Sequence, residues 1–288
     1  MKIYLNGRFV EKDQARISIF DHGFLYGDGA FEGIRSYSGL VFKLNEHIDR
    51  LFETAHTLMI EIALGKQKLR HAVLQTLKAN HLKDAYIRVV VTRGEGDLGL
   101  DPRKCQGKSH IVIIADKITL YPQKLYKEGM AIITVPTVRN LPDALNPQLK
   151  SLNYLNNIMA KIEANNGGFN EAIMLDHEGY VAECTGDNIF IIKKGILATP
   201  SQSRLRGITR DTVLHLALKN RIATQERLIT RHEVYNADEC FLTGTAAEII
   251  PVVKVDGRTI GEGRPGRLTL QLMKLFRELT KKEGVRVR

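Results

Sequence analysis

The sequence has little of the material from which disulfide frameworks and metal sites are built. Three of its 288 residues are cysteines, Cys105, Cys184 and Cys240, and they are scattered without a CxxC spacing. The nine histidines include no HxxxH pair. Because dispersed thiols in odd number are typical of proteins in a reducing compartment, we expect a cytoplasmic protein with no disulfide and no metal.

Long apolar runs are also missing. No stretch approaches the roughly 20 residues that a membrane-spanning helix needs. The first residues, MKIYLNGRFVEKD, turn polar too soon for a signal peptide, and Asn6-Gly7 predicts a hairpin there. With 43% hydrophobic and 26% charged residues, the composition is that of a globular protein with a real core, and we expect no membrane contact.

Acidic residues are fewer than basic ones, and the formal net charge of +10 raises the question of nucleic-acid binding. The basic residues are mostly dispersed among acidic ones. The densest excess, MKLFRELTKKEGVRVR near the C-terminus, has leucines at the spacing of a packed helix with a solvated outer face. Since no basic stripe with interleaved aromatic residues occurs, we predict no nucleic-acid partner. An anionic small-molecule ligand explains the charge equally well.

Strand and helix patterns follow one another in mixed order, which predicts an α+β protein with two domains. Residues 46–60 have helical spacing, and residues 85–94 and 110–115 are β-branched runs. The strand pattern stops at a Tyr-Pro step within KITLYPQKLYKE, before AIITVPTV begins a new one. We therefore predict a smaller α/β domain over residues 1–117, a linker over 118–128 and a larger domain over 129–288.

The stretch LKSLNYLNNIMAKIEA places Lys150 just before an apolar helical stripe. The stripe predicts an ordinary packed helix face, formed by Leu152, Leu155, Ile158, Met159 and Ile162. A lysine at a helix start is usually a solvated charge, but it can also be a buried amine that does chemistry. The periodicity alone supports only the first interpretation.

Two glycine-containing segments have features of anion sites. In RLRGITRD, a helix is expected to start around Ile208 or Thr209, directly after Gly207, and the exposed amides of a helix start can bind phosphate. In TGTAAE, a strand runs into a turn of small residues with free amides and hydroxyls. Each segment also fits a plain alternative, a capped helix in the first case and a simple turn in the second. No Walker A motif occurs.

Glu183, in GYVAECTGDNIF, follows a short strand and is surrounded by small residues. A buried carboxylate needs a partner, and a cationic ring nitrogen is one; a surface acid on an edge strand fits the pattern as well. A lysine amine, two anion-binding turns and an acid for a pyridinium nitrogen are together the parts that pyridoxal phosphate requires. Individually, each of these signals is weak.

The order of the motifs resembles that of the fold-type IV pyridoxal-phosphate enzymes, and most closely the branched-chain amino acid aminotransferases. The matching stretches are YGDGAFEGIR, EHIDRL, YIRVVVTRG, KSLNYLNN, AECTGDNIF, GITRD and TGTAAEI, and they cover nearly the whole chain. The resemblance implies the two-domain α+β fold of that family, the D-amino acid aminotransferase-like fold, with pyridoxal 5′-phosphate as the cofactor.

The resemblance also implies roles at the cofactor. Lys150 corresponds to the lysine that forms the Schiff base and moves a proton between the substrate α-carbon and the cofactor C4′ carbon. Glu183 corresponds to the acid on the pyridine nitrogen, and Tyr154 to the tyrosine that hydrogen-bonds the phenolic oxygen. The phosphate would be held by Arg50, by the amides of Ile208 and Thr209, and by Thr245.

On the substrate side, the resemblance points to Tyr26, Phe31, Gly33 and Arg35 in YGDGAFEGIR and to Tyr86 and Arg88 in YIR. Tyr86 and Arg88 correspond to groups that accept a carboxylate, Arg88 being suited to the second carboxylate of glutamate. The amides of Thr245 and Ala246 would hold the α-carboxylate. Without the resemblance, core packing is the favoured interpretation of Phe31 and Tyr86.

Two related subclasses share parts of this pattern. D-amino acid transaminases share KSLN and GITRD, but typically carry leucine at the position of Tyr154 and an Arg-x-His pair where this chain reads GDLGLDP. Aminodeoxychorismate lyases typically lack FEGIR and the YIR strand. The combination found here favours the branched-chain subclass. Arg206 departs from the pattern, because proline often precedes GIT, and it adds positive charge near the expected phosphate turn.

The expected reaction is therefore a ping-pong transamination between small-molecule amino acids and 2-oxo acids. Leucine, isoleucine or valine gives its nitrogen to the cofactor, and 2-oxoglutarate takes it up to become L-glutamate. The loop GEGDLGLDP, residues 94–102, resembles one that closes the pocket of a partner subunit. A homodimer or a larger homo-oligomer is therefore expected.

Overall fold

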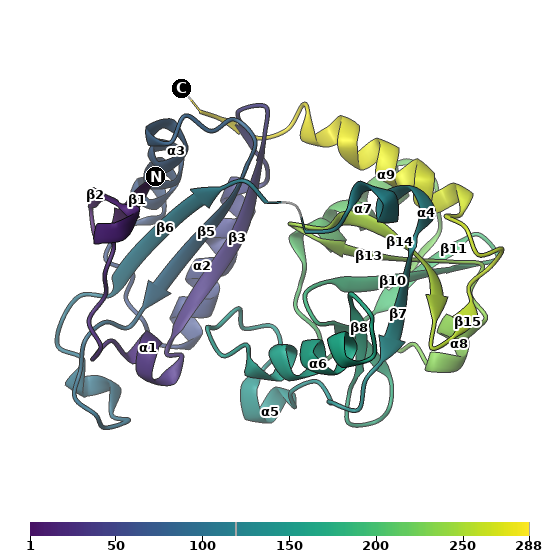
Figure 1. The fold of residues 1–288 in the computed structure, drawn as a ribbon, viewed down its shortest axis with the longest axis horizontal. Coiled ribbons are helices and arrows are strands. Elements are labelled where there is room, and N and C mark those ends of the chain that lie inside the picture. Colours follow the sequence, from purple (N-terminus) through teal and green to yellow (C-terminus); the bar gives the residue numbers. More distant parts are fainter. Residues whose placement is uncertain (119, 288) are drawn as a thin grey trace. The chain divides into compact units, whose positions relative to one another are not determined.

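The computed structural model describes residues 1–118 and 120–287, and their packing divides the chain into two compact units (Figure 1). Unit 1 comprises residues 1–118, 149–153 and 280–287. Unit 2 comprises residues 120–148 and 154–279. Each unit therefore contains segments that are distant in the sequence.

Unit 1 is built on a seven-stranded sheet in the order β16-β4-β3-β5-β6-β1-β2, with neighbouring strands antiparallel. Its strands are β1 (Lys2–Leu5), β2 (Arg8–Glu11), β3 (Gly29–Tyr37), β4 (Leu40–Val41), β5 (Ala85–Thr92), β6 (His110–Asp116) and β16 (Val285–Arg286). Its helices are α1 (His22–Tyr26), α2 (Leu44–Thr57) and α3 (Lys66–Ala79), with 3-10 turns at Lys12–Gln14 and Pro102–Lys104. The predicted hairpin is confirmed, since β1 and β2 pair across Asn6 and Gly7.

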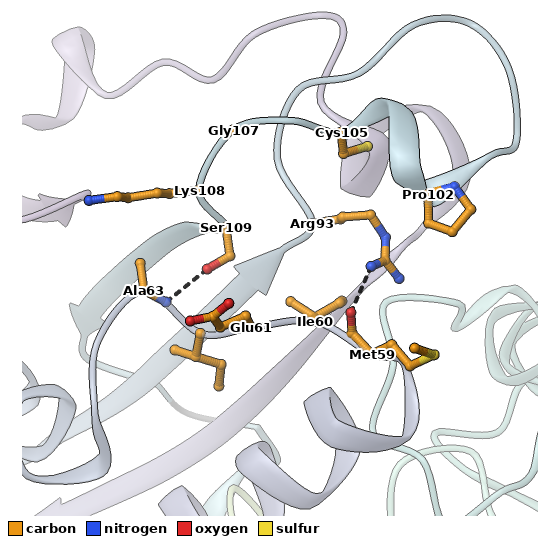
Figure 2. A pocket seen from close by; sticks show the side chains of 11 residues that line it. Met59, Ile60, Glu61, Ala63, Arg93, Pro102, Cys105, Gly107, Lys108 and Ser109 are labelled. Carbon is orange, nitrogen blue, oxygen red and sulfur yellow. Dashed lines mark hydrogen bonds between the residues drawn. The ribbon is translucent and has the colours of Figure 1, made fainter.

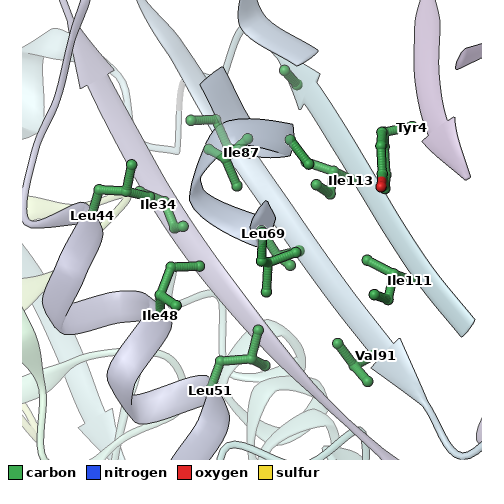
Figure 3. Packing of buried hydrophobic residues seen from close by; sticks show 14 of the residues in the cluster. Tyr4, Ile34, Leu44, Ile48, Leu51, Leu69, Ile87, Val91, Ile111 and Ile113 are labelled. Atoms are coloured by element: carbon green, nitrogen blue, oxygen red, sulfur yellow. The ribbon is translucent and has the colours of Figure 1, made fainter. Parts of the chain in front are cut away.

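The core of unit 1 lies between this sheet and the helices α2 and α3. Figure 3 shows Leu44, Ile48 and Leu51 of α2 beside the side chains of Ile34 on β3 and Ile87 on β5. The helical residues recur at spacings of three and four, and β5 buries alternate residues, so each element turns one apolar face inward. This packing fixes α2 against β3, the two elements that carry much of the candidate site.

Unit 2 is built on a mixed nine-stranded sheet in the order β12-β11-β10-β13-β14-β7-β8-β9, with β15 paired to β14. Its strands are β7 (Met130–Thr134), β8 (Ala172–Leu175), β9 (Val181–Cys184), β10 (Asn188–Lys193), β11 (Ile196–Pro200), β12 (Thr224–Arg227), β13 (Glu239–Gly244), β14 (Glu248–Val255) and β15 (Arg258–Thr259). Its helices are α4 (Gln123–Glu128), α5 (Pro142–Leu145), α6 (Leu155–Asn166), α7 (Ile208–Lys219), α8 (Arg231–Tyr235) and α9 (Arg267–Thr280).

The core of unit 2 is dominated by β-branched and aromatic side chains on the central strands. Phe190 of β10 stacks on Phe241 of β13, with ring centroids 4.9 Å apart. These residues are register partners, so the stack also links β10 to β13, the strand that precedes the turn at Thr245. Burying such side chains is the main source of stability for the sheet that positions this half of the candidate site.

The packing divides the chain differently from the predicted domains 1–117 and 129–288. The lysine segment (Leu149–Asn153) packs with unit 1, because the amide of Phe31 donates to the carbonyl of Lys150 (3.0 Å) and the amide of Leu152 to that of Gly29 (2.9 Å). The C-terminal strand β16 also returns to unit 1 and pairs with β4. Thr119 and Arg288 lie outside the described residues.

The predicted linker, residues 118–128, is in large part packed structure. Tyr121 is buried in the core of unit 2, and α4 contacts β14. The Tyr-Pro step therefore marks the entry to a helix: Pro122 stands directly before α4, where its fixed φ is tolerated.

The prediction that the apolar stripe of helix α6 is an ordinary packed face is wrong for the single chain. Its apolar stripe is exposed in the chain: Leu155 is 68% exposed, Ile158 50%, Met159 46% and Ile162 45%. The opposite face is buried through small and polar residues, Asn157, Ala160 and Ala164, and contacts β8. We call Leu155, Ile158, Met159 and Ile162 the α6 stripe. Leu152, which precedes the helix, is half-buried.

Over residues 1–118 and 120–287, no helix has the length and apolar character that crossing a membrane would require.

Candidate active site

The lysine segment is held against two elements of unit 1. Its backbone extends along β3 through the two hydrogen bonds given above and a bridge between Ala30 and Ser151. The amide of Lys150 also donates to Oγ1 of Thr54 on α2, at 3.3 Å. Lys150 is therefore fixed through its backbone to both β3 and α2, although about a hundred residues separate these elements from it in the sequence.

The predicted substrate residues of β3 and β5 share one face of the sheet. In the antiparallel register Gly33 lies opposite Arg88, and Arg35 opposite Tyr86. Residues two apart on a strand point to the same side, so Phe31 joins this face as well. Five residues that were predicted from two separate motifs are thus brought together.

Aromatic and cationic groups are packed closely on this face. The guanidinium of Arg88 lies 4.4 Å from the centroid of the Phe31 ring and donates to the Tyr86 hydroxyl at 3.2 Å. A Cβ atom at Gly33 would come within 2.0 Å of that hydroxyl, so glycine is required for this approach. Nζ of Lys150 lies 4.6 Å from the same Phe31 centroid. An amine and a guanidinium therefore lie over one apolar ring, and the guanidinium is in turn bound to a phenol hydroxyl.

On the opposite face of β3, a buried carboxylate binds two residues of α2. Nε and Nη2 of Arg50 donate to the two oxygens of Glu32 at 2.7 and 2.8 Å, and Nδ1 of His47 lies 2.7 Å from Oε2. Glu32 is fully buried and His47 nearly so. His47 and Arg50 are three residues apart on α2, which puts both side chains over the same part of β3.

The electrostatics of this cluster favour an ionised carboxylate. Burial alone would raise the pKa of Glu32, but the charges of Arg50 and His47 and their hydrogen bonds bring it down to about 2. Burial lowers the pKa of His47, and the nearby charges of Arg50 and Lys150 add to this against the opposing effect of Glu32. At neutral pH His47 is therefore a neutral ring whose Nδ1–H donates to Glu32.

In unit 2, Glu183 is also a buried carboxylate with an arginine partner. Nε of Arg139 donates to its Oε1 at 2.7 Å, and both side chains are 7% exposed. The other oxygen accepts hydrogen bonds from the Asn188 amide at 3.3 Å and from the Leu205 backbone amide at 3.0 Å. A carboxylate offers about four acceptor positions, so Oε1 retains capacity for one more donor.

The predicted helix start after Gly207 is confirmed, because α7 begins at Ile208. Among the residues that the structure describes, no side chain caps this end of α7, and Thr209 is buried in its first turn. A Cβ atom at Gly207 would lie 2.0 Å from Oδ1 of Asn188, so the loop can pass this close only with glycine. Asn188 thus contacts Glu183 on one side and the loop before α7 on the other.

The turn after β13 comprises Thr245, Ala246 and Ala247. It lies beside the residues just described, because Thr243 at the end of β13 pairs with Asn188 in the sheet register. Within residues 1–118 and 120–287, the Thr243 hydroxyl is one of two buried side-chain groups left without a hydrogen-bond partner. Unit 2 therefore gathers Glu183, the start of α7 and this turn around Asn188, the first residue of β10.

Other predicted residues lie apart from these contacts. Tyr154 belongs to unit 2 and stands at the N-terminal boundary of α6. The hydroxyl of Tyr26 donates to the carbonyl of Leu98 at 2.5 Å and so contacts the loop of residues 94–102. Arg206 is exposed in the loop before α7. The pKa of Glu226 is lowered mainly by a hydrogen bond from Arg210, and the charge of Arg206 makes a smaller contribution in the same direction.

A second buried acid pair lies in unit 2. The Tyr121 hydroxyl is 3.3 Å from Oε2 of Glu171 and 3.4 Å from Oδ2 of Asp187. Burial and the charge of Glu171 raise the pKa of Asp187 to about 7. Since a Cβ atom at Gly244 would lie 2.0 Å from Oδ1 of Asp187, this pair supports the turn after β13.

Unit 1 also contains an open hollow of about 560 Å³ (Figure 2). It is lined by Met59, Ile60, Glu61, Ile62, Ala63, Arg93, Pro102, Cys105, Gly107, Lys108 and Ser109. Figure 2 shows the guanidinium of Arg93 at the carbonyl of Met59, and this side chain also forms two hydrogen bonds to Asp28. None of the predicted site residues lines this hollow. All three cysteines are free thiols, and the described residues contain no cluster able to hold a metal.

Sequence reasoning missed three residues of this arrangement: Glu32, His47 and Arg139. For the first two a signal existed, because Glu32 interrupts the apolar strand of GAFEGI and EHIDR places a histidine and an arginine on one helix face. A charged residue in a strand buried on both faces requires a partner of opposite charge. Arg139 had no such signal, since it lies in a loop and its partner Glu183 is 44 residues away.

The sequence and the fold of this chain match a known family. The family model of class IV amino-transferases matches residues 29–255. The chain belongs to this family. A protein from Methanocaldococcus jannaschii, whose naming as a branched-chain-amino-acid aminotransferase is itself provisional, is 55% identical over 290 residues, 100% of this chain and 99% of the relative. D-alanine aminotransferase from Bacillus licheniformis is 36% identical over 277 residues, 93% of each chain.

The crystal structure of the branched-chain amino acid aminotransferase of Escherichia coli superposes on this aminotransferase with a TM-score of 0.94. The two sequences are 33% identical, and the match covers 97% of this chain and 94% of the other. The resemblance inferred from the motifs is therefore confirmed, as is the α+β, fold-type IV class of the fold.

Proposed function

We propose that this aminotransferase moves the amino group of L-leucine, L-isoleucine or L-valine to 2-oxoglutarate, giving branched-chain 2-oxo acids and L-glutamate. The observation that carries the proposal is the packing of Lys150 and Arg88 on the Phe31 ring. This face offers apolar surface for an aliphatic side chain, an amine for proton transfer and a guanidinium for a carboxylate. A site that binds a hydrophobic amino acid and a dicarboxylate in turn needs the apolar surface, the amine and the guanidinium.

The residues present fit pyridoxal 5′-phosphate. The uncapped amides at the start of α7 suit the phosphate, as do the cationic side chain of Arg50 and the hydroxyl of Thr245. Oε1 of Glu183 has capacity for a donor such as a protonated ring nitrogen. The same oxygen also accepts a hydrogen bond from Arg139, so the buried acid has a partner of opposite charge. In the proposed site Tyr154 donates to the phenolic oxygen. When bound, the cofactor supplies an electron-poor ring that accepts the electron pair of the broken Cα–H bond.

In the proposed reaction, Lys150 binds the cofactor and then moves a proton. Its Nζ would take the proton from the substrate Cα and deliver it to C4′ of the cofactor. The backbone hydrogen bonds to Phe31 and Thr54 fix the main chain of Lys150, which limits the region that its amine can reach. Glu183 holds a proton on the ring nitrogen throughout, because its negative charge favours the protonated ring.

The proposed substrate contacts combine apolar and polar groups. Phe31 forms the apolar wall, and Gly33 leaves the space in which the hydroxyl of Tyr86 can bind a carboxylate together with Arg88. Arg35 lies beside them on the same face, opposite Tyr86 in the register. Tyr26 contributes its ring, because its hydroxyl is engaged with the carbonyl of Leu98.

The amides of Thr245 and Ala246 are proposed to bind the α-carboxylate of the substrate. Backbone amides in a tight turn suit this task because they present fixed donors at no cost of side-chain ordering. The turn is anchored on both sides by β13 and β14.

The substrate assignment is tested by supplying L-leucine and D-alanine separately with 2-oxoglutarate and measuring glutamate. We expect fast glutamate formation with L-leucine and at least a hundredfold less, about 3 kcal/mol in the transition state, with D-alanine. The alternative of a D-amino acid transaminase deserves the comparison because a D-alanine aminotransferase is among the relatives. Preference for D-alanine would overturn the proposal, and pyruvate release from aminodeoxychorismate would instead indicate the lyase subclass.

We also propose that the active form is a homodimer or a larger homo-oligomer in the cytoplasm. Support for assembly comes from the α6 stripe, whose four apolar side chains are exposed in the single chain, and from Leu98 and Leu100, which are exposed in the loop of residues 94–102. Contiguous apolar patches of this kind are typical of association surfaces. The three free thiols support a reducing compartment. Sedimentation of the purified protein tests the assembly, and a monomer at micromolar concentration would refute it.

A further inference from the structure

The cluster of Glu32, His47 and Arg50 has a composition that the proposed reaction does not explain by itself. Arg50 alone has a proposed role, that of binding the cofactor phosphate. Glu32 is fully buried on the face of β3 that turns away from Phe31, so it lies on the side of the strand remote from the substrate face. Its interactions, however, are directed entirely at the element that carries Arg50.

Both oxygens of Glu32 are used to fix the orientation of Arg50. Two parallel N–H donors of the guanidinium, Nε and Nη2, reach the two oxygens at 2.7 and 2.8 Å. A bidentate contact of this kind fixes the plane as well as the position of a guanidinium, which a single hydrogen bond does not. Arg50 would otherwise retain several rotatable bonds and about 2 kcal/mol of side-chain entropy.

His47 fixes the carboxylate in turn. Its Nδ1 is 2.7 Å from Oε2 of Glu32, and the ring is buried. One turn beyond Arg50 on the same helix, Thr54 accepts a hydrogen bond from the amide of Lys150. A single face of α2 therefore joins the carboxylate, the arginine and the backbone of the lysine, all within unit 1.

We propose that Glu32, steadied by His47, is a positioning residue that pre-orients Arg50 for the phosphate group of the cofactor. This inference rests on the proposed function, because it assigns Glu32 a task in the same cofactor site. Glu32 touches neither substrate nor cofactor; it acts through Arg50. The consequence is specific: loss of Glu32 weakens the recognition of the phosphate and leaves the recognition of the pyridine ring unchanged.

The test compares two ligands that differ in the phosphate alone. Apo protein is titrated with pyridoxal 5′-phosphate and with pyridoxal, and binding is followed by absorbance and by protein fluorescence. For Glu32→Gln we expect the affinity for pyridoxal phosphate to fall about 10- to 100-fold, the range for a lost hydrogen bond to a charged group, and the affinity for pyridoxal to stay within about twofold. Glu53→Gln, an exposed substitution of the same kind on α2, should change neither affinity.

A double-mutant cycle identifies the route of the effect. If Glu32 acts through Arg50, Glu32→Gln has no further effect on phosphate recognition once Arg50→Gln is present. Additive losses of phosphate affinity in the two variants would overturn the proposal. So would an equal weakening of both ligands by Glu32→Gln, which is the signature of a merely structural role, or no change in either.

Because removal of the buried charge can impair folding, Glu32→Asp is the second variant. It keeps the charge but draws the carboxylate back by one methylene, so the guanidinium shifts while the ion pair remains. We expect a selective loss of pyridoxal phosphate affinity with a preserved circular dichroism spectrum, and unchanged affinity would contradict the proposal. Wild-type protein that binds neither ligand would refute the proposed function itself, whereas selective failure of the variants to respond would refute the role of Glu32 alone.

Discussion

Glu32 in unit 1 and Glu183 in unit 2 are both buried carboxylates bonded to an arginine, yet the two pairs are used in opposite ways. In unit 1 the carboxylate is enclosed and the arginine, Arg50, is the proposed ligand-binding group. In unit 2 the arginine, Arg139, supports the carboxylate, which is the proposed ligand-binding group. The pair contacts are almost equal in length, 2.7 Å in each case.

The comparison teaches that either member of a buried arginine–carboxylate pair can be the proposed ligand-binding group: Arg50 is more exposed than Glu32, whereas Arg139 and Glu183 are equally buried. Glu32 accepts as many hydrogen bonds as Glu183, from Arg50 and His47, but its side chain is 0% exposed, so a ligand meets Arg50 and not the carboxylate. Glu183 has two donors on Oε2 and one on Oε1, which leaves an acceptor position. A partner also spares each site the cost of an isolated buried charge before the cofactor binds.

The largest effect is expected where the proposed ligand-binding charge of the pair acts on the reaction directly. Glu183→Gln removes the negative charge that keeps the ring nitrogen protonated, so kcat with L-leucine should fall by about 100- to 1000-fold. Steady-state kinetics measure this, with exposed Glu178→Gln as the matched control. Turnover within tenfold of wild type would show that Glu183 does not act on the ring.

Removing Arg50, the proposed ligand-binding group of unit 1, should lower the affinity for the cofactor more than it lowers kcat. Arg50→Gln takes away a phosphate ligand, and we expect affinity for pyridoxal phosphate to fall by about 100-fold while kcat at saturating cofactor changes far less. The variant also leaves Glu32 buried without its main partner, so the free energy of unfolding should fall by about 3–5 kcal/mol. Equilibrium titration and urea unfolding measure the two effects. An unchanged affinity would remove Arg50 from the phosphate site.

A smaller effect is expected when the supporting arginine of unit 2 is removed. Arg139→Gln leaves Glu183 in place with its Asn188 and Leu205 contacts, so kcat should fall by about tenfold, the effect of one lost charge-assisted hydrogen bond. The ratio of the affinities for pyridoxal phosphate and pyridoxal should stay the same, in contrast to Arg50→Gln. A change in that ratio would mean that the two pairs do not have the separate tasks described here.

The smallest effect concerns pH and the acid pair beneath the turn after β13. The pKa of Asp187 is raised to about 7 by burial and by Glu171, with Glu183 adding to the shift and Tyr121 and Lys161 opposing it. The folded state therefore keeps a proton that the unfolded chain releases at lower pH, and this contribution to stability is lost as pH rises through about 7.

Asp187→Asn removes this titration. As pH rises from about 5.5 to 8.5, the melting temperature of the variant should increase by a few degrees relative to that of wild type. A change of about 1 kcal/mol shifts Tm by about 2–4 °C in a protein of this size. Glu32 predicts the reverse sign, because its pKa is lowered to about 2 and its contribution is lost on acidification. A melting-temperature difference between Asp187→Asn and wild type that does not vary with pH would contradict the raised pKa of Asp187.

Much of the fold could be predicted because local patterns dominate it. The hairpin at Asn6-Gly7, the helix over residues 46–60 and the helix start after Gly207 all follow from turn chemistry and periodicity within a few residues. The placement of the lysine segment could not be predicted in this way. It depends on backbone hydrogen bonds to Gly29 and Phe31, which are more than a hundred residues earlier.

The candidate site, too, could be predicted where local sequence motifs carry it and not where it depends on contacts between distant residues. The register of β3 and β5 brings together Phe31, Gly33 and Arg88, which the motifs had already indicated. The partners of the buried carboxylates were not predicted, because Arg139 belongs to a loop with no local pattern. The α6 stripe was misjudged for a related reason. Apolar periodicity shows that a face avoids water but not whether this chain or another covers it.

The central claim is that Lys150 is the residue that binds the cofactor and moves the proton. The most direct measurement is borohydride reduction of the protein loaded with pyridoxal phosphate, followed by proteolysis and mass spectrometry of the labelled peptide. The account predicts one dominant label, on Lys150, and its loss together with all turnover in Lys150→Ala. A label on another lysine, or turnover retained in Lys150→Ala, would contradict it.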